Sequence, residues 1–221
     1  MTAFSSKQLS FIKKYDPSGQ IELARGISIY AHTGQFRSDK SPYFTHPERI
    51  ALAILDLAVT ASELVFYDEI YKSHLMDLFV GAVAVGYLHD TIEDNPEITS
   101  EYLISKKVDR SIVSNTSLLT KSKEDYYFSY LDRILRLSTT EILVPVLVKI
   151  HDIQDNLQGL EESKKASKQK IEKYLLALYT LAADVKFKAD LFLGPLDSGT
   201  YIAKLIDEIS TNLLRRYYKN Y

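Results

Sequence analysis

The side chains best suited to chemistry include a cluster of histidine and acids at His89, Asp90, Glu93 and Asp94. On a helix His89 and Glu93 would share one face, and Asp90 and Asp94 another, because residues four apart lie one turn apart. An imidazole beside carboxylates suits Zn²⁺, Mn²⁺ or Fe²⁺, and a carboxylate-rich set of ligands favours Mn²⁺ or Mg²⁺. The spacing alone is equally compatible with a solvated acidic helix end, because acidic clusters usually lie on the surface.

A second polar cluster follows the apolar residues 146–148. Asp152, Asp155 and Asn156 stand at helical positions i, i+3 and i+4, so they are expected on one helix face. By itself this pattern is more typical of a polar helix surface than of a site.

The earliest of the three clusters combines Arg37, Tyr43 and His46, with Pro47 directly after the histidine. Proline is common in the first turn of a helix, so His46 is expected at a helix entry. A single histidine in that position more often has a structural role than a metal-binding one.

These clusters must be positioned by helices, because the apolar residues recur at helical spacing and strand-like alternation is hard to find. The 8 glycines and 6 prolines are few for 221 residues. The sequence therefore predicts an all-α, compact helical bundle. Its expected helices lie at 21–31, from 47 onward, 63–78 (one helix or two), 77–94, from 99 onward, 125–137, 145–157, 164–183 and 198–218.

Composition excludes several kinds of site. The chain has no cysteine, so thiolate metal sites, disulfides and a cysteine nucleophile are ruled out. The net charge of −2 lacks the basic excess of a dedicated nucleic-acid binder. The longest apolar run, 78–88, is about half of the ~20 residues that a bilayer span requires. With no secretory pattern at the N-terminus, we expect a cytoplasmic protein without a membrane or nucleic-acid partner, its oligomeric state left open.

Taken together, the three clusters resemble a known family. Their order, H-x-G-Q-x-R…P-Y-x-x-H-P, then H-D-x-x-E-D, then K-x-x-D-x-x-x-N, is similar to the hydrolase domain of the RelA/SpoT-type alarmone enzymes. The similarity runs from about residue 20 to about residue 160. The chain has no room for a synthetase domain beside the hydrolase, so it resembles a stand-alone small alarmone hydrolase of the metazoan SpoT-homologue kind. The resemblance implies an HD-type helical bundle, with a core at 1–160 and C-terminal helices at 161–221 packed on it in the same domain.

The resemblance also implies a metal site. The positions that match the family's ligands are His46, His89, Asp90 and Asp152, and the ion is typically Mn²⁺. Two imidazoles and two carboxylates would leave a divalent ion electrophilic, with positions for water and a phosphate oxygen.

Glu93 and Asp94 match the family's acidic pair, which orients or deprotonates the attacking water or protonates the leaving oxygen. As neighbouring carboxylates they are expected to titrate as a coupled pair, with one pKa raised.

The expected substrate contacts lie around the first and third clusters. Arg37 matches the arginine that packs on the guanine base, and Tyr43 and Asn156 match positions that line the nucleoside pocket. Lys40 is expected to replace a phosphate contact, because Ser38 stands where the family often has a basic residue. Lys149 fits either a phosphate contact or support for the helix of the third cluster, and support is the preferred role.

Other departures concern specificity. Gln158 stands where the family commonly has an arginine, and His151 replaces an alanine and is expected beside the ligands without binding the metal. The segment 60–75 is longer than expected, which predicts an inserted helix near the pocket rim. Lys121 and the lysines of 164–173 are expected to be solvated, the clustered tyrosines to serve helix packing, and His32 to orient the Arg37 loop.

The leading hypothesis is metal-dependent hydrolysis of the 3′-pyrophosphate of (p)ppGpp to GDP or GTP and pyrophosphate. Two alternatives stay open: the same chemistry on another nucleotide, such as ppApp or NADPH, and a catalytically silent nucleotide-binding module.

Overall fold

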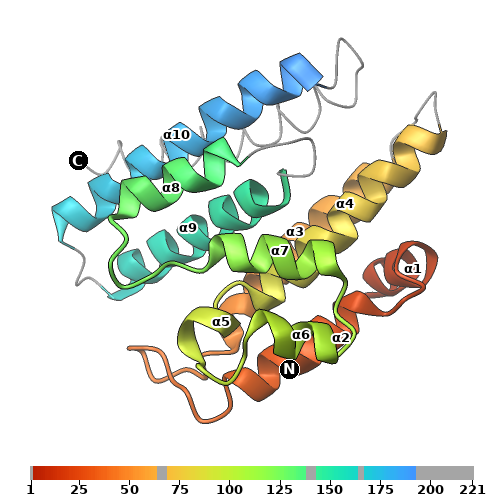
Figure 1. The fold of residues 1–221 in the computed structure, drawn as a ribbon, viewed down its shortest axis with the longest axis horizontal. Helices are drawn as coiled ribbons and strands as arrows, with labels where there is room; N and C mark the ends of the chain where they lie inside the picture. Colours follow the sequence, from red (N-terminus) through yellow and green to blue (C-terminus); the bar gives the residue numbers. More distant parts are fainter. Residues whose placement is uncertain (1, 64–68, 138–142, 164–166, 193–221) are drawn as a thin grey trace.

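The protein is described by a computed structural model, which defines residues 2–63, 69–137, 143–163 and 167–192 (Figure 1). Within these ranges the regular structure is entirely helical, and the only β-type pairing is an isolated bridge between Phe36 and Pro42. The helices are α1 (Ser6–Tyr15), α2 (Gln20–Ala31), α3 (Thr45–Ser62), α4 (Glu69–Leu88), α5 (Thr91–Asp94), α6 (Ser100–Ser105), α7 (Arg110–Leu119), α8 (Tyr127–Arg136), α9 (Leu143–Ser163) and α10 (Lys168–Phe192). The predicted all-α fold class is confirmed.

Helix α4 is the centre of the bundle. Most residues from Leu75 to Leu88 are buried, and α2, α3, α7 and α9 pack around the helix. Helices α3 and α4 run side by side (Figure 1). Gly86 allows their closest approach, because a Cβ at this position would lie 3.2 Å from the Cα of Ala51.

This central helix also passes the length and composition test for a membrane span, over Lys72–Asp94. Within the protein, 72% of its most apolar window is buried against other helices. The segment therefore behaves as the buried core helix that the sequence predicted.

The division of 63–94 into two overlapping helices was wrong. One uninterrupted helix, α4, spans residues 69–88, and the short α5 follows after a turn at His89 and Asp90. Two glycines inside α4, Gly81 and Gly86, do not interrupt it, because packing on all sides stabilises the helix beyond local propensity.

Two helices, α1 and α7, were not predicted because their sequences are short and polar. Helix α1 begins with a capping box between Ser5 and Gln8, and α7 buries a narrow stripe of its surface. The predicted start near residue 99 is confirmed, since the Thr99 hydroxyl accepts a hydrogen bond from the Tyr102 N–H. The helix predicted at 198–218 lies outside the described residues.

The placement of the long segment 60–75 near the pocket rim was also wrong. Its described parts are the end of α3 and the start of α4, at the far end of this helix pair (Figure 1). From His46 to Ser62 along α3 is about 24 Å at the rise of an α-helix. The described residues of this segment extend the helix pair away from the histidines.

Candidate metal centre

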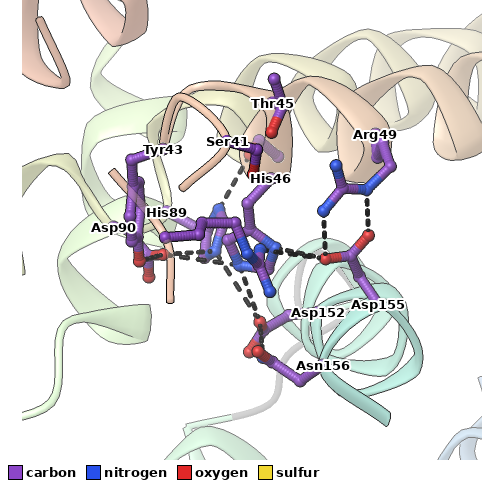
Figure 2. Close-up of polar contacts among 12 residues, drawn as sticks. Ser41, Tyr43, Thr45, His46, Arg49, His89, Asp90, Asp152, Asp155 and Asn156 are labelled. Atoms are coloured by element: carbon purple, nitrogen blue, oxygen red, sulfur yellow. Dashed lines mark hydrogen bonds and ion pairs between the residues drawn. The ribbon is translucent and has the colours of Figure 1, made fainter. Parts of the chain in front are cut away.

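Three helices bring together residues that lie far apart in the sequence. His46 is in the first turn of α3, His89 and Asp90 follow the end of α4, and Asp152 lies in α9. Figure 2 shows their side chains converging between these elements. His46, His89 and Asp152 are buried. The structure thus places in one cluster the four residues that the sequence predicted as ligands.

The distances within this cluster suit a single small cation. His46 Nε2 lies 3.2 Å from Asp152 Oδ1 and 3.6 Å from Asp90 Oδ2. His89 Nε2 lies 3.1 Å from Asp90 Oδ2 and 4.0 Å from Asp152 Oδ1. One ligand atom from each of His46, His89 and Asp90 falls within 4.8 Å of the others. His46, His89 and Asp90 thus form a group that could hold one ion, and Asp152 Oδ1 lies beside both imidazole nitrogens.

Both histidines direct the same nitrogen toward the carboxylates of this cluster. His89 Nδ1 donates to the Gly86 carbonyl oxygen at 2.9 Å, and His46 Nδ1 donates to Asp155 Oδ2 at 2.7 Å. Because a carbonyl and an ionised carboxylate only accept hydrogen bonds, the neutral ring carries its proton on Nδ1 and its lone pair on Nε2. His89 Nε2 is buried without a hydrogen-bond partner among the described residues. This donor arrangement fits a metal ion.

The two carboxylates are held by other side chains. The Tyr43 hydroxyl donates to Asp90 Oδ2 at 2.8 Å. Lys149 Nζ contacts Asp152 Oδ2 at 2.7 Å, and Asn156 Nδ2 donates to Asp152 Oδ1 at 2.6 Å. Lys149 therefore supports α9, as expected, whereas Tyr43 and Asn156 contact the acids directly as well as bordering the site.

The charges within the cluster also favour a cation at this place. Burial opposes charging of His46, but the hydrogen bonds that its ring donates to Asp152 and Asp155 outweigh it and raise its pKa to about 9. Burial also disfavours ionised Asp90, yet the neighbouring His89 and His46 lower the pKa of Asp90. Against the effect of burial, Asp90 raises the pKa of His89, and the charge of Lys149 together with His46 and His89 lowers the pKa of Asp152. Replacing two imidazolium protons by one divalent cation would conserve the net charge of this cluster.

The acidic pair lies in α5, beside the cluster. Loss of water contacts raises the pKa of both Glu93 and Asp94, and the charge of Asp90 adds to the rise in each. Glu93 Oε2 also accepts the Lys121 N–H at 3.0 Å. The expectation that one pKa of the pair is raised by mutual coupling needs correction, because both are raised and the charged neighbour responsible is Asp90.

Two predicted substrate residues differ in their surroundings. Arg37 Nη1 pairs with Asp155 Oδ2 at 3.2 Å, and its guanidinium lies over Gly159 on α9. Lys40 sits at a positive φ of 71° in the exposed 37–41 turn. Its side chain makes no hydrogen bond or ion pair with the cluster within the described part of the chain.

The remaining sequence expectations have mixed outcomes. His32 Nδ1 contacts Gln35 Oε1 at 2.8 Å and its ring lies 4.7 Å from that of Tyr43, as expected for a residue that orients the loop. Buried His151 stays uncharged, because burial lowers its pKa to about 4. Lys173 departs from the predicted solvated face, since its Nζ lies 4.5 Å from the Tyr127 ring.

Sequence reasoning gave no role to two residues that the structure places against His46. Asp155 binds the His46 ring, and Arg49, one turn after His46 in α3, forms a two-pronged ion pair with Asp155 (Figure 2). Helical spacing in the sequence places Asp152 and Asp155 on one face. The sequence does not show that Asp155 pairs with Arg49 on another helix.

Comparisons with known proteins bear on this geometry. No family model matches the chain. Over 161 residues it is 29% identical to the guanosine-3′,5′-bis(diphosphate) 3′-pyrophosphohydrolase of Haemophilus influenzae, which covers 69% of this chain and 20% of the relative. It is 25% identical over 178 residues to the bifunctional (p)ppGpp synthase/hydrolase SpoT of Escherichia coli, covering 76% of this chain and 22% of that protein. Over about seven tenths of its length, the chain is thus similar in sequence to SpoT-type alarmone enzymes.

This relationship concerns a limited part of those proteins. The chain spans about a fifth of the length of the curated SpoT-type relatives it matches. Another relative, from Brucella melitensis, is named GTP pyrophosphokinase rsh and is 24% identical over 76% of this chain and 21% of its own length.

A solved structure resembles the fold of this chain. It is described as a metazoan ortholog of SpoT that hydrolyses ppGpp and plays a role in starvation responses. The two align with a TM-score of 0.53 and 16% identity, covering 96% of this chain and 98% of the other. At this identity the match establishes the shared fold, and the alignment extends beyond the region of the three clusters.

Proposed function

We propose that this protein is a metal-dependent hydrolase that removes the 3′-pyrophosphate of (p)ppGpp, yielding GDP or GTP and pyrophosphate. The observation that carries the proposal is the convergence of His46, His89, Asp90 and Asp152, with both imidazole Nε2 atoms facing the two carboxylates. The names of the SpoT-type relatives support the choice of substrate.

These four residues would hold the divalent ion, for which we propose Mn²⁺. When bound, the ion would supply Lewis-acid polarisation of a phosphate oxygen and activation of water. The chain contributes orientation: Gly86 and Asp155 fix the histidine rings, while Tyr43, Lys149 and Asn156 fix the carboxylates. Pre-positioned groups of this kind avoid the cost of reorganisation during reaction.

Glu93 and Asp94 are the proposed proton-handling groups. Their raised pKa values bring them closer to neutral pH, where a carboxylate is a better general base and a carboxylic acid remains available as a general acid. The Lys121 N–H holds Glu93 from outside the cluster. We assign Glu93 to the attacking water or the leaving oxygen, with Asp94 assisting.

Arg37, Tyr43 and Asn156 are the proposed nucleoside contacts. Arg37 lies against α9 at Asp155 and Gly159, which leaves its flat guanidinium in a fixed place for stacking on a base. Exposed Lys40 is the proposed phosphate contact from the neighbouring turn.

The test is a nucleotide panel with purified, Mn²⁺-loaded protein. We expect ppGpp to release pyrophosphate, which phosphorus NMR separates from orthophosphate. His46→Ala and Asp90→Ala are expected to abolish turnover, while replacing the exposed His74 by Ala leaves it unchanged.

The same panel addresses the alternative substrates, which Ser38 and Gln158 keep open. Preferential turnover of ppApp would reassign the base, and orthophosphate release from NADPH would reassign the reaction. If the Mn²⁺-bound protein binds ppGpp but turns over no nucleotide, the chain is a binding module and the enzyme proposal is wrong.

A further inference from the structure

Asp155 is surrounded by donors at the edge of the metal cluster. Its side chain on α9 is 10% exposed. Its Oδ2 accepts from His46 Nδ1 at 2.7 Å, Arg49 Nη2 at 2.9 Å and Arg37 Nη1 at 3.2 Å. Its Oδ1 accepts from Arg49 Nε. A carboxylate with this many donors has one fixed position.

The charges around Asp155 decide which partner keeps the proton. Asp155 forms ion pairs with the guanidinium groups of Arg49 and Arg37, which favour its anionic form. An anionic carboxylate only accepts hydrogen bonds, so a neutral His46 ring must carry its proton on Nδ1. Its Nε2 lone pair is then left for the side that faces Asp90 and Asp152.

The anchor of Asp155 comes from the helix that carries His46. Arg49 follows His46 by three residues, so both side chains leave neighbouring positions on α3. The two N–H groups of Arg49 grip both oxygens of Asp155, a geometry that fixes direction as well as distance. The histidine and its acceptor are therefore held together by one clamp between α3 and α9.

We propose that Asp155 is a positioning residue of the metal centre, which fixes the ring orientation and the metal-binding nitrogen of His46 through a contact that Arg49 anchors. This inference rests on the proposed function, because it assumes that His46 is a ligand. Carboxylates that accept from the second nitrogen of a ligating histidine typically affect metal affinity by about 10- to 100-fold.

The experiment measures Mn²⁺ affinity without substrate. Free Mn²⁺ gives an electron paramagnetic resonance signal that is broadened when the ion is bound, so titration yields the dissociation constant directly. The variants are Asp155→Asn, which keeps the size of the side chain, and Asp155→Ala. The control is Asp132→Ala, which removes an exposed α8 carboxylate that also pairs with an arginine, Arg136, away from the cluster.

We expect the Asp155→Asn variant to bind Mn²⁺ about tenfold more weakly than wild type, and Asp155→Ala at least as weakly. Aspartate has two acceptor oxygens, whereas asparagine has one acceptor oxygen and one donor nitrogen. The asparagine therefore cannot accept hydrogen bonds from His46 Nδ1, Arg49 Nε and Arg49 Nη2 at the same time. The Asp132→Ala variant should bind Mn²⁺ like wild type. A second readout is the visible spectrum of the Co²⁺-loaded protein, which reports coordination geometry and should change in the Asp155 variants alone.

Circular dichroism separates this effect from a loss of folding. If folded Asp155→Asn protein binds Mn²⁺ within twofold of wild type, with an unchanged Co²⁺ spectrum, the inference is wrong. Should Asp155→Ala fail to fold, the Asp155→Asn result decides by the same criterion. Failure of the proposed function is a different outcome, in which the wild-type protein itself binds no Mn²⁺.

Discussion

Each of the four candidate ligands is held by at least one further contact. Gly86 and Asp155 take the Nδ1 protons of His89 and His46, Tyr43 holds Asp90, and Lys149 with Asn156 holds Asp152. Such contacts stabilise one rotamer and one tautomer of each ligand, which lowers the cost of binding a cation.

Substitution of one residue of the acidic pair can separate metal binding from the chemical step. Glu93→Gln removes a proton acceptor next to the four proposed ligands, so the variant should retain Mn²⁺ affinity. Its kcat should fall about 10²-fold or more. Steady-state kinetics and Mn²⁺ titration on the same sample check both statements, with Glu97→Gln as an exposed control nearby. Wild-type turnover by the Glu93→Gln variant would exclude Glu93 from proton transfer.

The raised pKa of His46 predicts how stability depends on pH without metal. The folded protein keeps the His46 proton up to about pH 9, whereas an unfolded histidine loses it near 6.5. Between these values the folded state binds more protons, so stability must fall as pH rises. The contribution, at most about 3 kcal/mol, is complete below pH 6.5 and lost as pH passes 9.

Thermal unfolding in EDTA from pH 6 to 9.5 measures this slope. The His46→Gln variant should flatten the curve, and a His74→Gln variant, changed at an exposed position, should follow wild type. A wild-type Tm that is constant or rises over this range would contradict the charge state inferred for the cluster.

Residue identities at the site were accessible from the sequence, but their partners were not. The motif order pointed to His46 and Asp152, and helical spacing placed Asp155 on the face of Asp152. No local pattern connects Asp155 with Arg49, because that ion pair depends on how α3 crosses α9. Likewise, no local pattern in the sequence predicts the hydrogen bond between Tyr43 and Asp90.

At the level of elements, the site depends on how closely α3 approaches α4. His46 enters α3 and His89 leaves α4, and both helices are in tight contact at Gly86 and Ala51. The Gly86 carbonyl oxygen also accepts the His89 Nδ1 proton. The helix contact and the histidine orientation are therefore set by the same residue.

This coupling predicts different outcomes for two glycines of one helix. In Gly86→Ala the new Cβ would lie 3.2 Å from the Ala51 backbone, so the helices must separate, at a cost of about 1–3 kcal/mol. The variant should also bind Mn²⁺ more weakly. Gly81→Ala meets nothing within 4 Å and should be neutral or stabilising by up to about 1 kcal/mol. Chemical denaturation and Mn²⁺ titration compare the two, and equal effects would exclude the proposed role of the helix contact.

Helical periodicity predicted that segments are helical more accurately than it predicted where each helix begins and ends. It found the buried residues of α4, yet divided that helix in two, because an apolar stretch that is buried all round carries no single-faced periodicity. It missed α1 and α7, whose helical state depends on capping and on contacts with α3, α4 and α9.

For the whole molecule, the bundle brings together three sequence clusters that are otherwise distant. Residues 46, 89–90 and 152 meet because the start of α3, the end of α4 and the middle of α9 come together. A cation bound there would link these helices, so Mn²⁺ should also raise the Tm. The organisation of 161–221 as helices of the same domain stays a prediction, although α10 packs on α8 and α9 in its described part.

The stoichiometry and affinity of Mn²⁺ binding test the central claim most directly. Equilibrium dialysis of the wild-type protein should give one Mn²⁺ per chain, and His46→Ala, His89→Ala and Asp152→Ala, taken from three different helices or turns, should each lose it while Asp132→Ala retains it. Folding of each variant is checked by circular dichroism. If folded His46→Ala or Asp152→Ala protein keeps one Mn²⁺ with wild-type affinity, these residues do not meet around a single cation and the account is contradicted.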